Sequence, residues 1–132
     1  MKVYIVKLNG IDHQVVKGVF TIYKEAVLFL EETLGMKMKA FNGNIWIDPS
    51  EDAQPGYFRI ERGEVKEETD EVYIVKLSVE CFSDSIVDVF SSRDDAVAYI
   101  EQYGDVRQES YNLWQHKESI YEHWTIEKQE IL

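Results

Sequence analysis

Val-Tyr-Ile-Val-Lys-Leu at residues 3–8 returns letter for letter at residues 72–77, and the likeness continues in order toward the C-terminus. Residues 19–21 (Val-Phe-Thr) match residues 89–91 (Val-Phe-Ser), and residues 44–46 (Asn-Ile-Trp) match residues 112–114 (Asn-Leu-Trp). Residues 58–61 (Phe-Arg-Ile-Glu) match residues 124–127 (Trp-Thr-Ile-Glu). Self-similarity at a nearly constant period is the signature of a repeated unit. The sequence therefore predicts two copies of one small unit, residues 1–67 and residues 70–132.

The size and composition of the chain indicate that the two copies pack together as one compact body. The chain has 132 residues, of which 45% are hydrophobic and 13% aromatic, so it carries enough apolar surface for a core. A single copy of about 65 residues is close to the size at which a lone core becomes marginal. Only two prolines and seven glycines argue against a disordered chain.

The charge of the chain narrows its range of partners. Twenty-five acidic and 14 basic residues give a formal net charge of −11. Such a surface repels nucleic-acid phosphates and anionic membranes at long range, so we expect neither direct nucleic-acid binding nor membrane binding. A basic protein partner fits this charge, and so does the simpler role of keeping the protein soluble.

Cysteine usage and the start of the chain predict a cytoplasmic location. The single cysteine, Cys81, cannot form an internal disulfide, as is usual in a reducing cytosol. The chain begins in a strand-like segment, without the charged and apolar regions of a signal peptide. No apolar run approaches the length of a membrane span.

Local patterns predict the same elements in both copies. In the first, β-branched and aromatic residues indicate a strand over 2–8 with apolar residues on both faces, a turn over 9–13 and a returning strand over 15–20. Thr21 is the expected N-cap of the helix that follows, and Gly35 its expected end. In the second copy, residues 92–95 (Ser-Arg-Asp-Asp) have the form of a capping box. The buried stripe of that helix is predicted to be Ala96, Val97, Ile100 and Tyr103, with Gly104 ending it.

The segments after the helices diverge before both copies close on a similar strand. Residues 44–47 predict a short strand, whereas helical spacing over 106–119 predicts a helix. Alternating residues over 57–61 and 121–127 predict the closing strands. The predicted class is α+β, with two β-β-α-(variable)-β units related by a pseudo-twofold axis. Their antiparallel strands form two sheets or one shared sheet, with a helix from each copy over one face.

This unit resembles a family of short, uncharacterised domains of phages and Gram-positive bacteria. Those domains open with a Val-Tyr-aliphatic strand, continue through a Gly-Val-Phe-Ser-Ser-like strand end into a helix with an early alanine, and close on an aromatic-x-Ile strand. The matching residues are 3–6, 18–21, 26–27 and 58–60 in the first copy, and 72–75, 88–92, 96–97 and 124–126 in the second. Asp88 replaces the expected Gly, and Thr21-Ile22 replaces Ser-Ser. The resemblance implies the fold and a phage connection, but no activity and no site residues.

The sequence contains no recognisable catalytic or metal-binding constellation. His13, His116 and His123 lack metal-ligand spacing, so we expect no metal and no cofactor. Cys81 follows an apolar strand, where a thiol is usually inert. Glu61 and Glu127 are equivalent in the repeat and could act as an acid–base pair, but an amphipathic strand also places such residues in water. Without a nucleophile, a base and an orienting group, the chain is predicted not to be an enzyme.

Aromatic residues are the best candidates for a binding site. Trp46 and Trp114 occupy equivalent places in the divergent segments, and Tyr57, Tyr121 and Trp124 lie nearby in the sequence. Tryptophan and tyrosine anchor protein interfaces and stack on bases. The alternative is that both tryptophans cover the ends of their own sheets, because tryptophan is mostly buried wherever it occurs.

These observations favour a non-catalytic protein that presents an acidic, aromatic surface to a protein partner. A phage origin would make that partner a host enzyme or a defence component, inhibited by the contact in the host cytoplasm. The first alternative is a small-molecule binder that holds a nucleotide signal in a cleft between the copies. Trp46 and Trp114 would then stack on bases, with positive charge from Lys37, Lys39, Arg59 and Arg62. The second alternative is a DNA mimic, whose carboxylates would be spaced like phosphates along one face.

Overall fold

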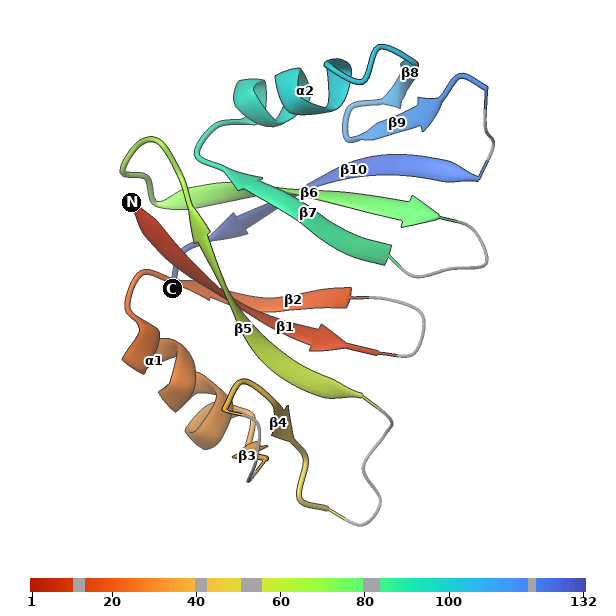
Figure 1. Ribbon diagram of the computed structural model, residues 1–132. Coiled ribbons are helices and arrows are strands. Elements are labelled where there is room, and N and C mark those ends of the chain that lie inside the picture. The colour runs from red at the N-terminus through yellow and green to blue at the C-terminus, as the bar shows by residue number, and fades with distance from the viewer. Residues whose placement is uncertain (11–13, 40–42, 51–55, 80–83, 119–120) are drawn as a thin grey trace. The chain divides into compact units, whose positions relative to one another are not determined.

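The computed structural model describes residues 1–10, 14–39, 43–50, 56–79, 84–118 and 121–132 (Figure 1). The chain forms two compact units. The N-terminal unit is Lys2–Gly63 together with Ile131–Leu132, and the C-terminal unit is Glu64–Glu130 together with Met1. Each unit has a five-stranded antiparallel sheet and a helix. The predicted α+β class is therefore confirmed, with two sheets rather than one; the pseudo-twofold axis stays a prediction.

The N-terminal unit begins with the antiparallel pair β1 (Lys2–Asn9) and β2 (Gln14–Phe20). Helix α1 (Tyr23–Leu28) follows and continues as a π-helical turn, η1 (Phe29–Thr33). Two short strands, β3 (Lys37–Met38) and β4 (Trp46–Ile47), precede the long strand β5 (Tyr57–Glu64). The sheet order is β2-β1-β5-β4-β3, so β1, which carries apolar residues on both faces, has a neighbouring strand on each side.

The C-terminal unit repeats this plan. Its antiparallel pair is β6 (Glu71–Val79) and β7 (Asp84–Phe90), followed by helix α2 (Arg93–Glu101). The strands β8 (Val106–Ser110), β9 (Leu113–His116) and β10 (Glu122–Glu130) complete it in the sheet order β7-β6-β10-β9-β8. In each unit the helix lies over one face of its own sheet (Figure 1).

The two sheets share an irregularity that supports their common origin. In the β1–β2 pair the register shifts between Val6 and Lys7, and in the β6–β7 pair it shifts between Val75 and Lys76. These are equivalent positions in the repeat. A bulge adds one residue to a strand and bends it, so its recurrence at one place means that both copies bend their hairpins alike.

The position where Asp88 replaces the expected glycine differs in its surroundings between the copies. A Cβ atom on Gly18 would lie 3.0 Å from Phe20 Cε2 and 3.2 Å from Leu132 Cδ1. These distances are shorter than ordinary van der Waals contact, which favours glycine at position 18. At the equivalent place the Asp88 side chain fits, and its Oδ1 accepts a hydrogen bond from the Val89 N–H at 2.8 Å.

The helix expected over residues 106–119 is wrong, because β8 and β9 form a hairpin there. The helical spacing over this segment includes only two apolar residues, Val106 and Leu113, too few to bury one face of a helix. Pairing of β9 with β10 instead buries Trp114, which is 1% exposed. Burial of this large side chain outweighs the local helical pattern.

The two helices begin differently. Ser92 is the N-cap of α2, as predicted, and its Oγ accepts a hydrogen bond from the Asp95 N–H at 3.2 Å. The predicted cap Thr21 is wrong, because the N-cap of α1 is Ile22, whose aliphatic side chain offers no acceptor. Gly35 and Gly104 follow the helical segments with φ near +70°, as predicted for helix ends.

Each unit buries its own core between its helix and one face of its sheet. Ala26 and Leu30 in the first helical segment are fully buried. Of the stripe predicted for the second helix, Ala96 and Ile100 are fully buried and Val97 packs against the core, whereas Tyr103 is exposed. The cores are Val6, Phe20, Ala26, Leu30, Trp46, Phe58 and Ile60 in the N-terminal unit, and Val75, Ala96, Ile100, Trp114, Trp124 and Ile126 in the C-terminal unit.

Each unit also includes residues from the opposite end of the chain. The Met1 ammonium donates a hydrogen bond to the Val65 carbonyl at 2.8 Å, and the Val65 N–H donates to the Met1 carbonyl at 2.9 Å. The Leu132 N–H donates to the Val19 carbonyl at 2.8 Å, beside a parallel bridge between Val19 and Ile131. Among the described residues no helix has the length and apolar character needed to cross a membrane.

Candidate functional site

The three tryptophans predicted to bind a partner lie inside the cores. Trp46 lies opposite Phe58 on neighbouring strands, and Trp114 lies opposite Trp124 at the equivalent place. All three indole rings are at least 95% buried. A buried ring cannot stack on a ligand, so this placement supports the alternative that the tryptophans cover their own sheets. Their buried Nε1 atoms have no hydrogen-bond partner among the described residues.

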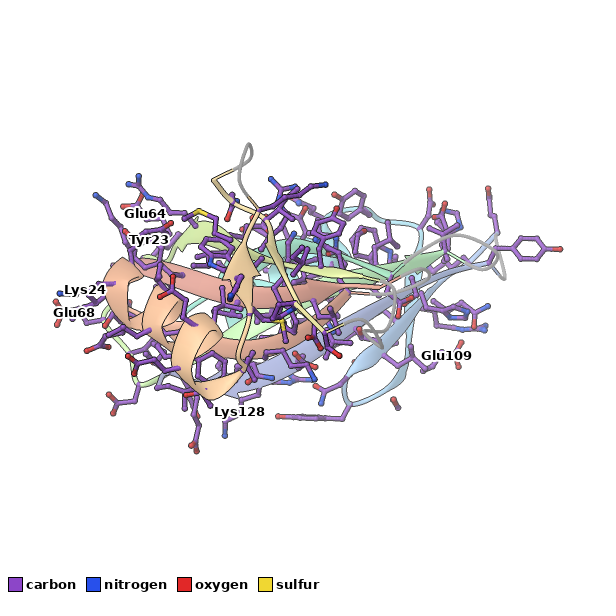
Figure 2. The ribbon with its side chains drawn as sticks, turned by 90° about the horizontal axis from the view of Figure 1, so that it is seen from below. Tyr23, Lys24, Glu64, Glu68, Glu109 and Lys128 are labelled. Atoms are coloured by element: carbon purple, nitrogen blue, oxygen red, sulfur yellow. The ribbon has the colours of Figure 1, made fainter. Side chains whose placement is uncertain are left out.

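The two predicted tyrosines, in contrast, reach the surface. Tyr57 begins β5 and Tyr121 directly precedes β10, and both side chains are exposed. The sequence did not single out Tyr23, at the start of α1, or Tyr103, just beyond α2, although both are exposed as well. Figure 2 shows Tyr23 projecting from the helix beside Lys24. Helical spacing placed Tyr103 in the buried stripe; instead its ring stacks on Trp124 with centroids 4.7 Å apart and leaves one side open to solvent.

In the C-terminal unit, the guanidinium group of Arg93 packs against the ring of Tyr111, the most exposed tyrosine of that unit. The Arg93 guanidinium lies 3.7 Å from the centroid of the Tyr111 ring and donates a hydrogen bond to the Tyr111 carbonyl. It also lies 5.8 Å from the ring of Trp114. These distances are those of a cation–π contact, in which the negative face of the ring attracts the cation.

The phenol of Tyr99, on α2, is partly buried by two neighbouring aromatic rings. Tyr99 packs against Phe90 and against Tyr103, with ring centroids 5.3 and 5.8 Å apart. Burial, followed by a hydrogen bond between the Tyr99 and Tyr103 hydroxyls, raises the pKa of Tyr99 to about 12. Tyr99 therefore stays neutral up to strongly alkaline pH.

The two equivalent carboxylates considered for acid–base work are paired with lysines. Lys7 Nζ lies 2.5 Å from Glu61 Oε2, and Lys76 Nζ lies 3.6 Å from Glu127 Oε1. Both lysine side chains are nearly buried, and the four residues are equivalent in the repeat. A pair that recurs in both sheets supports a structural role for the carboxylates.

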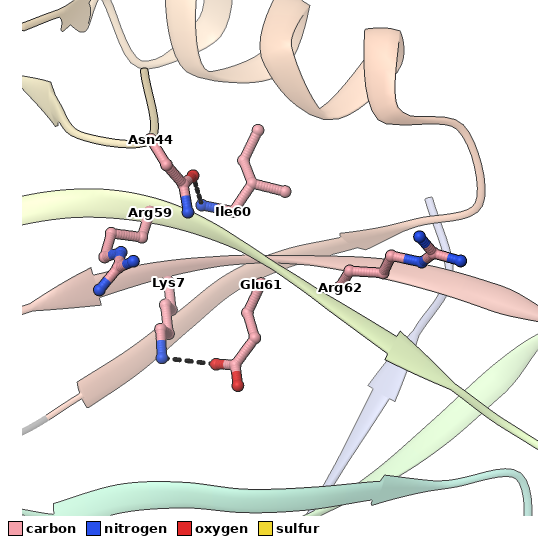
Figure 3. A pocket seen from close by; sticks show the side chains of 6 residues that line it. All are labelled: Lys7, Asn44, Arg59, Ile60, Glu61 and Arg62. Atoms are coloured by element: carbon pink, nitrogen blue, oxygen red, sulfur yellow. Dashed lines mark hydrogen bonds and ion pairs between the residues drawn. The ribbon is translucent and has the colours of Figure 1, made fainter. Parts of the chain in front are cut away.

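A pocket lies beside β5 in the N-terminal unit. Its volume is about 370 Å³, at the lower end of the range for small-molecule sites. Figure 3 shows its lining: Asn44 Oδ1 accepts the Ile60 N–H at 3.1 Å, and the Lys7–Glu61 pair lies on the other side of the strand. The full lining is Lys7, Asn44, Arg59, Ile60, Glu61 and Arg62.

The remaining candidates are histidines, the cysteine and the basic residues expected around a ligand. His116 Nδ1 accepts a hydrogen bond from the Glu118 N–H at 3.1 Å, and the described residues contain no group of three side chains that could hold a metal ion. His13 and Cys81 lie outside the described residues. Of the four basic residues predicted to surround a ligand, Arg59 and Arg62 line the pocket, whereas Lys37 and Lys39 do not.

Comparison with known proteins finds no matching family model, no similar curated protein and no similar solved structure. The resemblance to short phage domains therefore stays a prediction.

Proposed function

We propose that this chain is a non-catalytic, acidic module that binds a basic protein partner through exposed tyrosines. The observation that carries the proposal is the number of tyrosine rings at the surface. Five of the eight tyrosines are between 36% and 68% exposed: Tyr23, Tyr57, Tyr103, Tyr111 and Tyr121.

Tyrosine and net charge act together in such a contact. Tyrosine is enriched among the residues that dominate binding energies, because its rigid ring buries a large area at a small cost in entropy. A net charge of −11 attracts a basic partner over several ångströms and accelerates its encounter. The contact between Arg93 and Tyr111 is an internal example of how a partner arginine would settle on an exposed ring.

The resemblance to phage-borne domains suggests where to search for the partner. A non-catalytic module acts by occupying a surface of another molecule, and for a phage-borne module that molecule would belong to the host. We therefore propose a bacterial enzyme or defence component as the partner, inhibited by the contact.

Affinity capture tests this proposal. The full chain, immobilised through a tag, is incubated with a Gram-positive bacterial lysate at low salt and then washed with increasing salt. We expect one protein to be captured in near-stoichiometric amount and to be released as salt screens the attraction. Its identity, from mass spectrometry, should show a basic surface.

The matched variants test the role of the tyrosines. Tyr57→Ser with Tyr121→Ser should abolish capture, because it removes an exposed anchor at or just before the last long strand of each unit. Met38→Ser removes a similarly exposed apolar side chain and should leave capture intact. The proposal fails if no protein is retained at near-stoichiometric yield, or if the tyrosine variant captures as well as the wild type.

A further inference from the structure

Positive charge gathers around the pocket beside β5, although the chain as a whole is acidic. Three of its six lining residues are cationic, and its only carboxylate, Glu61, is already paired with Lys7. Arg59 and Arg62 therefore supply positive charge that the pocket itself does not neutralise. Figure 3 shows their guanidinium groups extending in different directions, with Glu61 between them.

The lack of partners for these two arginines is unusual in so acidic a protein. The chain has only four arginines and 25 acidic residues. Arg107 pairs with Glu109 at 2.7 Å, and Arg93 is held by Tyr111. Within the described part of the chain the guanidinium groups of Arg59 and Arg62 have no hydrogen-bond or ion-pair partner. Both residues line the same pocket.

The second copy shows that the fold does not require this arrangement. Thr125 stands where the first copy has Arg59. Lys128 stands where it has Arg62, and its Nζ lies 3.1 Å from Glu71 Oε2. In the first copy the position of Glu71 is occupied by Lys2, so the corresponding carboxylate is missing. The same sheet therefore forms with a neutral residue and a paired cation where the N-terminal unit has two free guanidinium groups.

We propose that the pocket beside β5 binds a small polyanion, with phosphate or carboxylate groups at both ends, through Arg59 and Arg62. The guanidinium group presents a planar fork of N–H donors that matches phosphate and carboxylate oxygens. Because the two guanidinium groups diverge, a ligand that reaches both must carry separated anionic groups. No aromatic side chain lines the pocket, so recognition rests on charge rather than on base stacking.

This site is independent of the proposed protein contact. It uses none of the five exposed tyrosines, and it lies within the N-terminal unit. It also differs from a site with stacking tryptophans, because Trp46 and Trp114 are both buried.

Titration of the full, isotope-labelled chain with tripolyphosphate, and separately with citrate, tests the proposal. We expect saturable NMR shifts, centred on the backbone amides and arginine Nε–H signals of residues 59–62, with at least one of the two anions. The phosphate arm and the carboxylate arm distinguish the two ligand chemistries. Arg59→Thr, which installs the residue of the second copy, and Arg62→Gln should each weaken binding about tenfold, since each removes a charge-assisted contact.

The control is Arg107→Gln, which removes the same charge from an exposed arginine of the C-terminal unit. It should bind the anion as the wild type does. Arg59→Lys keeps the charge but loses the fork, and should bind with intermediate affinity. Equal weakening in Arg107→Gln would reveal unspecific charge attraction and overturn the proposal, as would the lack of saturable shifts with both anions at millimolar concentration.

Discussion

Replacing Ser92 by alanine is expected to lower the free energy of unfolding by about 1 kcal/mol, within the range of about 0.5–2 kcal/mol measured for N-cap side chains. The Ser92 Oγ accepts a hydrogen bond from the Asp95 N–H at 3.2 Å. This N–H belongs to the first turn of α2, where backbone donors have no partner within the helix. Alanine would leave a part-buried donor without its acceptor. For a chain of 132 residues, 1 kcal/mol corresponds to a fall of about 4 °C in Tm.

The first helix offers the reverse experiment, because Ile22 stands where the second copy has Ser92. The backbone of Ile22 (φ −122°, ψ 121°) is extended like that of Ser92 (φ −137°, ψ 151°), so a serine would be placed to cap. Glu25, three residues later, would complete a capping box. Ile22 is 53% exposed, so replacing it also loses some apolar burial. Ile22→Ala is therefore the matched control, and Ile22→Ser should be more stable than it by about 0.5 kcal/mol, the lower end of the range for N-cap side chains.

Urea denaturation followed by far-UV circular dichroism measures both differences by linear extrapolation. The two comparisons should agree in sign, with a smaller difference at position 22, because the Glu25 N–H there already donates to the Ile22 carbonyl at 3.1 Å. The capping explanation is refuted if Ser92→Ala unfolds within about 0.3 kcal/mol of the wild type, below the smallest N-cap effects. Equal stability of the two variants at position 22 would refute it as well.

Three further outcomes follow from the structure. Leu30→Ala and Ile100→Ala each remove a fully buried side chain and should cost about 2–5 kcal/mol in urea denaturation; a loss below about 1 kcal/mol would contradict the assigned cores. Burial raises the pKa of Tyr99 to about 12, above its unfolded value near 10. The contribution of Tyr99 to the free energy of unfolding should therefore be fully present below pH 10 and be lost between pH 10 and 12. Tyr99→Phe should remove this pH-dependent loss of stability. The hydrogen bond from Lys128 lowers the pKa of Glu71. The contribution of this pair to stability should therefore be lost as the pH falls through the lowered pKa of Glu71. In an NMR titration, the titration midpoint of Glu71 should be higher in Lys128→Gln than in the wild type.

The repeat made most of the fold predictable. The identical sequences at residues 3–8 and 72–77 carry apolar side chains at the same positions and need equivalent packing partners. Both segments form strands that lie between two other strands of their sheets. The short match at residues 44–46 and 112–114 also proved structural, because both tryptophans lie opposite an aromatic residue of the last strand. Matching within one chain works here because equal side chains at equal spacing bury the same surface.

Local patterns failed where tertiary contacts decide. The spacing of residues 106–119 predicted a helix, but the segment forms strands because this buries Trp114 against β10. Tyr103 was predicted on the buried face of its helix, but α2 ends at Glu101 and the Tyr103 ring is half open to solvent. Local sequence patterns could not predict that Glu61 and Glu127 pair with lysines, because the partners in each pair are more than 50 residues apart in the sequence.

The differences between the copies say more about function than their likenesses. A residue with a purely structural role in the sheet should have the same type of side chain in both units, because the two sheets have the same strand order. The Lys–Glu pairs obey this rule and need no other explanation. Arg59 and Arg62 break it, since the second copy uses Thr125 and a Lys128 that is neutralised by Glu71. Because neither guanidinium group has a partner among the described residues and the second copy builds the same sheet without them, we propose that they are present for an anion that binds there.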